Sequence, residues 1–431
     1  MLLNKLSGIW EKEKTPFYFD KTTCLSFKDI ENIIVFGMDN LTKGDVVALI
    51  GDFDPESIST LLKLIDHGCI VVPLTSETKN QHKYFLEESK AQFVFRGNKL
   101  EKIISKDQIR HPLLDELRNK KNPGLILFTT GTTGLPKAIL HDFAPFLRRY
   151  NTPRPSLKAL SFLLFDHIGG INTLLHMLFN KGSVVSIKDR GVKNIIDICN
   201  KYSIELLPTT PTFLRMLSLY PSIENLFPKS IKIITYGTER LDQPTLNILC
   251  KKFPLIDFRQ TYGMSELGIL RVKSESRQSL YMRIGGEGVE WKAINNMLYI
   301  KSQNRMIGYL NADSPFDNEG WYCTKDLIKQ KEDLIKIVGR ESDVINVGGL
   351  KFLPVEVEKV CLEYKGVIHA KVIGKNNPIT GQHAEVIIEK SHAEFNEKKF
   401  LVYLKNNLPK HMVPLRIIFK KIELSHRFKK L

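Results

Sequence analysis

The sequence predicts an α/β protein in which parallel β-sheets are covered by helices. From residue 45, "DVVALIGDFDPESISTLLKLIDHGCIVVPL" contains an apolar run, a helix start at Asp54-Pro55, an amphipathic stretch, a glycine stop and a second apolar run. The same alternation returns in "KALSFLLF", "TLLHMLFNKGSVVSI", "IIDICNKYSIELLP" and "IKIITYG". Short β runs separated by helical patterns are typical of parallel sheets with helices on their faces.

Two changes of pattern predict the domain organisation. Between residues 281 and 338 the chain has short β runs and turns, such as "NNMLYIKS" and "DLIKIVGR", which indicate a small antiparallel β region. Beyond it, "PVEVEKVCLEYKGVIHAKVIG" starts a new set of helices and strands. Since 431 residues exceed what one core organises, we expect a large N-terminal domain over residues 1–338 and a small α+β C-terminal domain over residues 339–431.

Apolar patterning and cysteine usage indicate a cytoplasmic protein without a membrane span. No stretch approaches the ~20 uncharged apolar residues that a span needs, and the start "MLLNKLSGIWEKEK" is too short in apolar residues for a signal peptide. The six cysteines are scattered and form no CxxC pair. We therefore expect all six to be packing residues in a reducing compartment.

The net charge of +16 is compatible with nucleic acid, a membrane surface or phosphate-rich small molecules as partners. The lysines are spread along the chain rather than gathered in blocks. In the most basic segment, "KHMVPLRIIFKKIELSHRFKKL", apolar residues alternate with charges as they do in a folded element. Because no recognisable nucleic-acid module accompanies this segment, we expect a solvated face and no nucleic-acid partner.

The stretch "TTGTTGLPKA" at residues 129–138 follows the apolar run "GLILF". Gly131 and Gly134 free backbone N–H groups to point inward, and Lys137 adds a positive charge, a combination that suits a polyphosphate. Hydroxyl donors come from four threonines: Thr129, Thr130, Thr132 and Thr133. The P-loop pattern requires a Gly-Lys-Ser/Thr ending, so a different phosphate-binding geometry is implied. A solvent-exposed turn is the alternative for this loop taken alone.

Further segments match one family in its own order. They are "FDHIGG" (165–170), "YGTE" (236–239), "QTYGMSE" (260–266), "GYLN" (308–311), "GWYCTKDL" (320–327), "GRESDVINVGGLKFLPVEVE" (339–358) and "LPKHMVP" (408–414). With "TTGTTGLPK" they make the sequence resemble the acyl-adenylate-forming enzymes, which include acyl-CoA synthetases, firefly luciferases and the adenylation domains of peptide synthetases. The resemblance runs from about residue 25 to the C-terminus.

This resemblance implies a two-step ligase for a small-molecule carboxylic acid. ATP converts the acid to an acyl-adenylate with the help of Mg²⁺, and a thiol then forms a thioester. The thiol implied is that of coenzyme A. Transfer to the phosphopantetheine of an acyl carrier protein is the alternative within this chemistry, and a non-catalytic nucleotide-binding homologue is the alternative outside it. The C-terminal domain is expected to be a mobile lid.

The resemblance also assigns residues to roles. The expected catalytic residues are Lys137, Glu266, His167 and Lys429, with Glu266 also the Mg²⁺ ligand. Asp326 and Arg340 are expected to hold the ribose hydroxyls, and "YGTE" with Tyr262 to bind the adenine. The full set expected to bind the nucleotide or the coenzyme is Thr129, Thr130, Gly131, Thr132, Thr133, Gly134, Gly237, Thr238, Glu239, Tyr262, Gly263, Ser265, Asp326, Arg340 and Lys351.

Several positions depart from the family pattern. Ile168 stands where adenylation domains for amino acids place an aspartate, and an isoleucine cannot pair with an α-ammonium. We therefore expect a plain fatty, aryl or other organic acid. Ala138 and Lys325 replace glycines, and Ser342 stands where an Asp or Lys is usual at the domain hinge. The ending "SHRFKKL" leaves Lys429 without the glycine that precedes the family's lysine.

Overall fold

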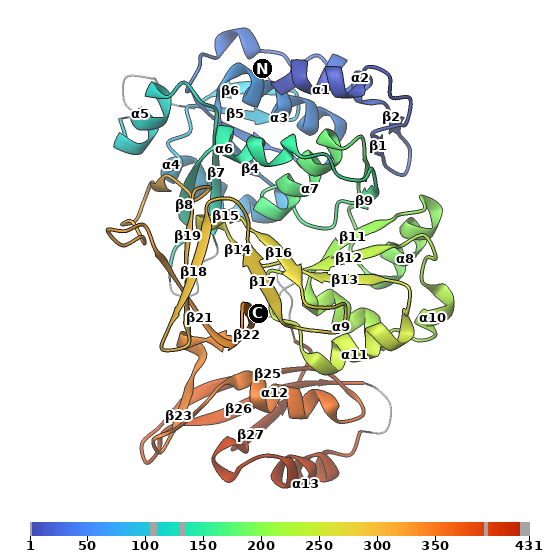
Figure 1. Ribbon diagram of the computed structural model, residues 1–431, viewed down its shortest axis with the longest axis vertical. Coiled ribbons are helices and arrows are strands. Elements are labelled where there is room, and N and C mark those ends of the chain that lie inside the picture. The colour runs from blue at the N-terminus through green and yellow to red at the C-terminus, as the bar shows by residue number, and fades with distance from the viewer. Residues whose placement is uncertain (1, 104–109, 130–133, 392–394, 423–431) are drawn as a thin grey trace.

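The computed structural model describes residues 2–103, 110–129, 134–391 and 395–422 (Figure 1). Its helices are α1 (Leu2–Trp10), α2 (Phe27–Asn32), α3 (Pro55–His67), α4 (His82–Glu88), α5 (Pro112–Asn119), α6 (Phe143–Arg148), α7 (Ile168–Phe179), α8 (Val192–Lys201), α9 (Pro211–Leu219), α10 (Ile223–Leu226), α11 (Gln243–Lys252), α12 (Pro354–Glu363) and α13 (Glu397–Asn407). Among the described residues, no helix combines the length and the apolar character that crossing a membrane requires.

The first large sheet has the strand order β20-β8-β7-β4-β3-β5-β6. Its strands are β3 (Val46–Ile50), β4 (Ile70–Leu74), β5 (Phe93–Arg96), β6 (Lys99–Lys102), β7 (Gly124–Thr129), β8 (Lys137–Asp142) and β20 (Gly308–Tyr309). The strand-helix-strand unit predicted from residue 45 is confirmed as β3, α3 and β4. Asp54 caps the start of α3 by accepting from the backbone N–H of Ser57, and Gly68 ends it in the left-handed conformation, with φ 89°.

The second large sheet has the order β13-β12-β11-β9-β10-β1-β2, and all of its pairs are parallel except β1 with β2. Its strands are β1 (Tyr18–Phe19), β2 (Cys24–Leu25), β9 (Lys158–Leu160), β10 (Ser183–Val185), β11 (Leu206–Thr209), β12 (Ile233–Tyr236) and β13 (Asp257–Gln260). Cys24 is exposed on the edge strand β2. The expectation that all six cysteines pack inside is therefore wrong for Cys24, because an edge strand leaves one face to solvent.

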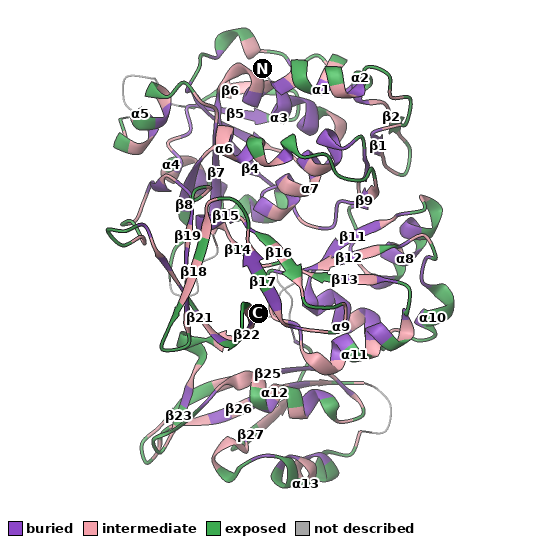
Figure 2. Ribbon diagram, viewed as in Figure 1, coloured by how far each residue is buried: buried purple, intermediate pink, exposed green. Residues whose placement is uncertain are grey.

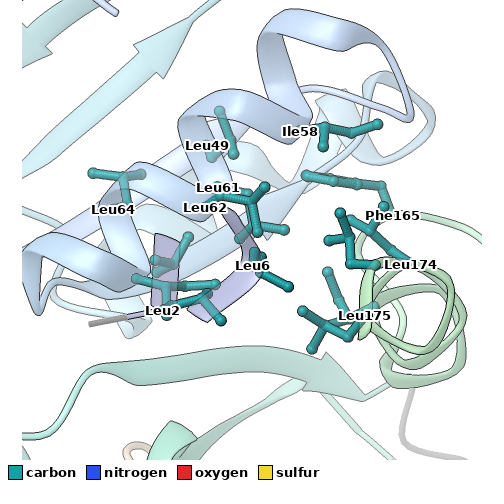
Figure 3. Packing of buried hydrophobic residues seen from close by; sticks show 14 of the residues in the cluster. Leu2, Leu6, Leu49, Ile58, Leu61, Leu62, Leu64, Phe165, Leu174 and Leu175 are labelled. Atoms are coloured by element: carbon teal, nitrogen blue, oxygen red, sulfur yellow. The ribbon is translucent and has the colours of Figure 1, made fainter. Parts of the chain in front are cut away.

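Helices α1, α3 and α7 pack between the two large sheets. Figure 3 shows Leu6 of α1, Leu62 of α3 and Leu175 of α7 pointing toward one another. These side chains belong to one buried apolar cluster that also contains Leu49 of β3 and Val184 of β10. Because burying each such side chain stabilises the fold by roughly 1.5–3 kcal/mol, this shared layer joins the two sheets into one body. Figure 2 shows buried residues on these helices and also in the other clusters of the large domain.

A six-stranded antiparallel sheet follows, as the change of pattern after residue 280 predicts. Its order is β16-β17-β22-β21-β19-β18. The strands are β16 (Arg271–Ser274), β17 (Met282–Gly285), β18 (Val289–Ile294), β19 (Met297–Ser302), β21 (Tyr322–Lys331) and β22 (Leu334–Arg340), and a small pair, β14 (Gly263–Met264) with β15 (Gly268–Ile269), lies beside it. Asp326, the last residue of "GWYCTKD", lies on β21 opposite Arg340 of β22, and its carboxylate accepts from Tyr262, which follows β13.

The C-terminal part has its own sheet and its own core. Its strands are β23 (Ile345–Val347), β24 (Leu350–Phe352), β25 (Val367–Asn377), β26 (Gly381–Lys390) and β27 (Arg416–Phe419), with α12 and α13 packed against them. Its apolar cluster draws only on residues 345–419. The domain boundary at Gly339 stays a prediction, and β22 continues one residue beyond it, to Arg340.

Candidate active site

The predicted phosphate loop connects two neighbouring antiparallel strands. Thr129 ends β7 and lies opposite Lys137, which begins β8. Residues Thr130, Gly131, Thr132 and Thr133 lie outside the described residues, so their predicted role is not addressed by the structure. Gly134 and Lys137 are exposed at the start of the return strand. The structure therefore places Lys137 at the mouth of the first sheet, where a ligand can reach it.

Two residues that the sequence reasoning missed hold the end of this loop. Tyr84 Oη donates to the carbonyl oxygen of Pro136 at 2.9 Å, and Asn311 Nδ2 donates to the same oxygen at 3.2 Å. Asn311 Oδ1 also accepts from the backbone N–H of Ala138 at 2.9 Å. Since these bonds flank Lys137 on both sides, they fix the direction in which its side chain leaves the strand. Asn311 ends the "GYLN" segment, whose match to the family was the available signal.

Lys137 and Glu266 come together through Tyr309. The Lys137 ammonium lies over the Tyr309 ring, 4.7 Å from its centroid. Tyr309 Oη donates to Glu266 Oε1 at 2.7 Å, and Glu266 is 8% exposed. Burial and the negative charge of Glu266 both raise the pKa of the Tyr309 hydroxyl, which therefore stays a hydrogen-bond donor. Lys137 and Glu266, which were predicted from separate motifs, thus both contact Tyr309.

The carboxylate of Glu266 suits a magnesium ion that brings most of its own ligands. Mg²⁺ takes few protein carboxylates and keeps waters and substrate phosphates as its other ligands. Across the described ranges, no group of three or more His, Cys, Asp and Glu side chains is arranged to hold a metal. The donor set around Glu266 therefore fits a nucleotide-borne Mg²⁺ and not an ion held entirely by protein side chains.

A second cluster joins Tyr262, Asp326 and Arg340. Tyr262 Oη donates to Asp326 Oδ2 at 2.6 Å, and Arg340 Nε lies 3.2 Å from Asp326 Oδ1. Asp326 and Arg340 are direct partners in the pairing of β21 with β22. Burial raises the pKa of the Asp326 carboxyl, while Tyr262 and Arg340 lower it in part. The predicted ribose pair is therefore assembled by strand register.

Groups of both clusters influence Tyr322. Burial raises the pKa of this tyrosine, and the negative charges of Glu266 and Asp326 raise it further. Both carboxylates therefore act on the same hydroxyl from their own clusters. Lys137, Glu266, Tyr262, Asp326 and Arg340, predicted from four separate segments, belong to one region of the molecule.

The "YGTE" segment follows β12, beside the end of β13. Tyr236 pairs with Gln260 across these parallel strands, and the backbone N–H of Thr261 donates to the Tyr236 carbonyl at 2.7 Å. A Cβ on Gly237 would lie only 2.1 Å from Thr261 Oγ1, so the close approach of the two segments requires glycine there. Thr238 is exposed with φ 70°. Ligand sites in parallel sheets lie at such carboxyl ends of strands.

Glu239, Gly263 and Ser265 lie close to this edge in the chain but differ in their surroundings. Glu239 Oε2 accepts from Thr212 Oγ1 at 2.6 Å, which links "YGTE" to α9. Gly263 is exposed in the short strand β14. Ser265, which precedes Glu266 in a 3₁₀ turn, is only partly exposed.

His167 and Ile168 begin α7 next to the carboxyl end of β9. His167 caps the helix, because its Nδ1 accepts from the backbone N–H of Gly169 at 3.0 Å. Ile168 is 9% exposed and starts the helix. Asp166 is buried, and its Oδ2 accepts from Thr75 Oγ1 at 3.2 Å. A buried isoleucine at position 168 supplies no charge or hydrogen bond to an α-ammonium.

Within the described ranges, the structure shows no contact between Lys351 and these clusters. Lys351 is exposed on β24, opposite Asn346 of β23. In the same hairpin, Gly348 and Gly349 have φ of 60° and 87° and face open space. Ser342 lies exposed in a 3₁₀ turn, with its hydroxyl 3.0 Å from Asp343 Oδ1. Lys429 lies outside the described residues.

Two departures from the family pattern have a physical explanation. Ala138 is fully buried opposite Phe128, where a methyl group fits the packed face of β8. Lys325 precedes Asp326 with φ 57°, the left-handed region that favours glycine. The position thus keeps the backbone conformation of a glycine although a lysine occupies it.

Comparisons with known proteins give the chain a family. The family model of AMP-binding enzymes matches residues 37–305. A 2-succinylbenzoate–CoA ligase of Staphylococcus epidermidis is 24% identical over 69% of this chain, which spans 65% of that relative. The ligase of the same name from Bacillus subtilis is 23% identical over 88% of this chain and 84% of its own length. Gramicidin S synthase 2 of Brevibacillus brevis is 24% identical over 86% of this chain and 9% of its own length.

Solved structures show the same fold. An anthranilate CoA ligase in complex with anthranoyl-AMP has a TM-score of 0.81 at 15% identity, covering all of this chain and 95% of that one. The o-succinylbenzoate CoA synthetase of Bacillus subtilis, in complex with its acyl-adenylate intermediate, has a TM-score of 0.75 at 19% identity, covering 99% and 96%. These likenesses confirm the predicted fold class. Because the family model matches well over half of the residues, the resemblance seen in the motifs is confirmed too, and the chain belongs to the AMP-binding enzyme family.

Proposed function

We propose that this AMP-binding enzyme is an ATP-dependent acid–thiol ligase. In the first step a carboxylate oxygen attacks the α-phosphorus of ATP, the bond to the β-phosphate oxygen breaks, and pyrophosphate leaves. In the second step a thiol loses its proton and attacks the acyl carbon, the bond to the phosphate oxygen breaks, and AMP leaves. The family and the curated CoA ligases that the chain resembles support this reaction class.

The contact of Lys137 and Glu266 through Tyr309 carries the proposal. Pyrophosphate develops negative charge as it leaves, and the Lys137 ammonium can stabilise that charge without moving far. Mg²⁺ bound with the nucleotide would neutralise phosphate charge, and Glu266 is the residue that would hold it. Tyr309 keeps the Glu266 carboxylate in place by donating to one of its oxygens.

Tyr262, Asp326 and Arg340 are proposed to bind the nucleoside. The Asp326 carboxylate can accept from ribose hydroxyls, while Arg340, whose side chain is 44% exposed, can donate to them. The Tyr262 ring and the backbone after β12 would bind the adenine. Positioning and charge stabilisation of this kind account for adenylation without a nucleophile from the protein.

The acid is proposed to lack an α-ammonium, because Ile168 offers such a group no partner. Two of the similar proteins are named for aryl acids, 2-succinylbenzoate and anthranilate. We propose an aryl or other organic acid for this chain and coenzyme A as the thiol. The likeness to gramicidin S synthase 2 keeps a carrier-protein phosphopantetheine as the second candidate acceptor.

A pyrophosphate-release assay tests the proposal. Benzoate, anthranilate, 2-succinylbenzoate, medium-chain fatty acids and amino acids are each supplied with ATP and Mg²⁺, with coenzyme A or a pantetheinylated carrier protein as acceptor. We expect release with at least one organic acid, a thioester with coenzyme A, and no release with amino acids. Higher release with amino acids would contradict the substrate class, and no release with any acid would favour a non-catalytic nucleotide-binding protein.

A further inference from the structure

We propose that Arg215 positions the C-terminal domain for the first half-reaction by binding three of its backbone carbonyl groups. The inference rests on the proposed function, because it assigns a step of that reaction to the domain orientation seen here. Arg215 lies on α9 of the N-terminal domain and is 4% exposed. The carbonyls belong to Leu362 in the last turn of α12 and to Val367 and Ile368 at the start of β25.

The guanidinium group of Arg215 is almost fully bonded across the boundary. Its Nε donates to the carbonyl oxygen of Ile368 at 3.1 Å. Its Nη2 donates to the carbonyl oxygens of Leu362 at 3.2 Å and Val367 at 3.1 Å. Its Nη1 donates within its own domain, to Thr245 Oγ1 at 3.0 Å. A planar group with five donors in fixed directions suits such a set of acceptors better than an ammonium does.

The acceptors are carbonyl groups that the C-terminal domain leaves available. Leu362 lies in the last turn of α12, where carbonyls lack partners within the helix and the helix dipole favours a cation. The pairing of β25 with β26 shifts between Val367 and His369, so Ile368 has no partner residue in the ladder. A β-bulge of this kind directs a backbone group away from the sheet. Both irregularities face Arg215.

Over the described residues, the apolar cores of the two domains do not merge at this interface. The apolar cluster of the C-terminal domain contains only residues of that domain, and the cluster around α9 and α11 contains only residues of the N-terminal domain. Figure 1 shows α12 and β25 on the side of the C-terminal domain that faces α9 and α11. In the part of the chain that the structure describes, no apolar cluster spans the interface, and the three hydrogen bonds of Arg215 cross it.

This orientation suits adenylation better than thioester formation. The β23–β24 hairpin with Gly348 and Gly349, expected to face the site when the thiol attacks, points into open space. For the second half-reaction the domain must rotate, and Arg215 must exchange its three carbonyl partners for water. A bonded guanidinium therefore favours the first state, and its loss should favour the second.

Arg277 provides a matched control. It also donates to three backbone carbonyls, those of Ile256, Cys250 and Phe253, but all three belong to the N-terminal domain. Arg215→Met and Arg277→Met thus remove the same kind of contact, and only the first crosses the boundary. Arg215→Lys keeps the charge and loses the planar fork.

The first measurement needs no substrate. Nitroxide labels are placed at two exposed positions, through Lys251→Cys on α11 and Lys375→Cys on β25, in a chain that also carries Cys24→Ser and Cys323→Ser. Pulsed electron paramagnetic resonance then gives the distribution of distances between the labels. We expect Arg215→Met to add a second population that the unchanged chain and Arg277→Met lack. A distribution identical to that of the unchanged chain would overturn the assignment.

The second measurement separates the half-reactions, with an acid found active in the pyrophosphate assay and with its synthetic acyl-adenylate. Arg215→Met should slow adenylate formation about 10-fold and leave conversion of the supplied adenylate within about 2-fold. Arg215→Lys should slow adenylate formation less than Arg215→Met does. Arg277→Met should change the rate of neither half-reaction. Equal losses in both half-reactions would overturn the positioning role. If no acid is active, the proposed function fails, and the distance measurement still decides the role of Arg215.

Discussion

At the scale of single residues, Tyr309 connects the two opposite charges of the candidate site. Its ring lies under the Lys137 ammonium and its hydroxyl donates to Glu266. The cation and the carboxylate are therefore held apart by an aromatic spacer and do not neutralise each other. That arrangement leaves both available to a magnesium-bound polyphosphate.

Replacing Tyr309 by phenylalanine should slow adenylate formation about 10-fold while the cation–π contact with Lys137 persists. The reason is that the Glu266 carboxylate loses the hydrogen bond that holds it in place, and a catalytic group that is no longer correctly positioned is less effective. Tyr18→Phe is a matched control, because the Tyr18 hydroxyl also donates to a carboxylate, that of Asp20 at 3.0 Å, outside this site. Pyrophosphate release at saturating ATP measures the effect, and equal rates for the two variants would contradict it.

The left-handed backbone conformation of Lys325, with φ 57°, should lower the free energy of unfolding. A residue with a Cβ is destabilised by roughly 1–2 kcal/mol in the left-handed region, a strain that glycine avoids. Glycine in turn loses about 0.5–1 kcal/mol, because its unfolded chain has more conformational entropy. Lys325→Gly should therefore raise the free energy of unfolding by up to about 1 kcal/mol in urea titrations. Lys329→Gly, at an exposed position of the same strand without positive φ, should lower it. A loss of stability for both variants would be the contrary result.

At the scale of elements, β8 carries site residues outward and core residues inward. Lys137 is exposed at its start, whereas Ala138 and Leu140 are fully buried and His141 is 2% exposed. Burial lowers the pKa of the His141 imidazole from 6.5 to about 4, so the side chain is neutral in the folded enzyme at neutral pH. The strand thereby places a titratable group inside the sheet, at the end of β8 that lies away from the predicted phosphate loop.

This burial makes stability depend on pH with a definite sign. An unfolded histidine takes up a proton near pH 6.5, whereas the pKa of folded His141 is about 4. Below pH 6.5 the unfolded state therefore binds a proton that the folded state does not, and the free energy of unfolding falls as the pH falls. His141→Gln should reduce the loss of unfolding free energy between pH 7 and 4.5 by about 2–3 kcal/mol. Urea unfolding at the two pH values measures this.

His176 gives an independent check on the same mechanism. Burial also lowers its pKa from 6.5 to about 4, with Arg149 and Arg154 contributing. His176→Gln should therefore reduce the acid sensitivity as well, and the double variant should reduce it further. Acid sensitivity unchanged in all three variants would show that these imidazoles are not buried as described.

The elements that could be predicted are those with local signals. Asp54-Pro55 starts α3 and Gly68 ends it through contacts within a few residues, and apolar runs mark β3 and β4. The contacts around Lys137 have no such local signal. Tyr84 and Asn311 are 227 residues apart in the chain, and Tyr309 is 43 residues from Glu266. Only the return of β8 beside β7 and the pairing of β20 with β8 bring them together.

At the scale of the whole molecule, two parts with separate apolar cores are joined by the hydrogen bonds of Arg215. Four of the motifs that the sequence singled out carry residues that the sheets bring together: Lys137 with Glu266, and Tyr262 with Asp326 and Arg340. The motifs could not predict that Lys351, expected to bind the nucleotide or the coenzyme, would lie exposed on the β23–β24 hairpin, since its surroundings depend on domain orientation. Lys429 stays a prediction, with adenylation lost and thioester formation kept in Lys429→Ala.

Lys137 and Glu266 are proposed to stabilise the departing pyrophosphate. The most direct test is single-turnover pyrophosphate release with saturating ATP, Mg²⁺ and an active organic acid, comparing the unchanged enzyme with Lys137→Ala and Glu266→Gln. We predict that each variant is at least ~100-fold slower, with unchanged thermal unfolding for Lys137→Ala because that side chain is exposed. Rates near that of the unchanged enzyme for both folded variants would contradict the assignment of the phosphate site.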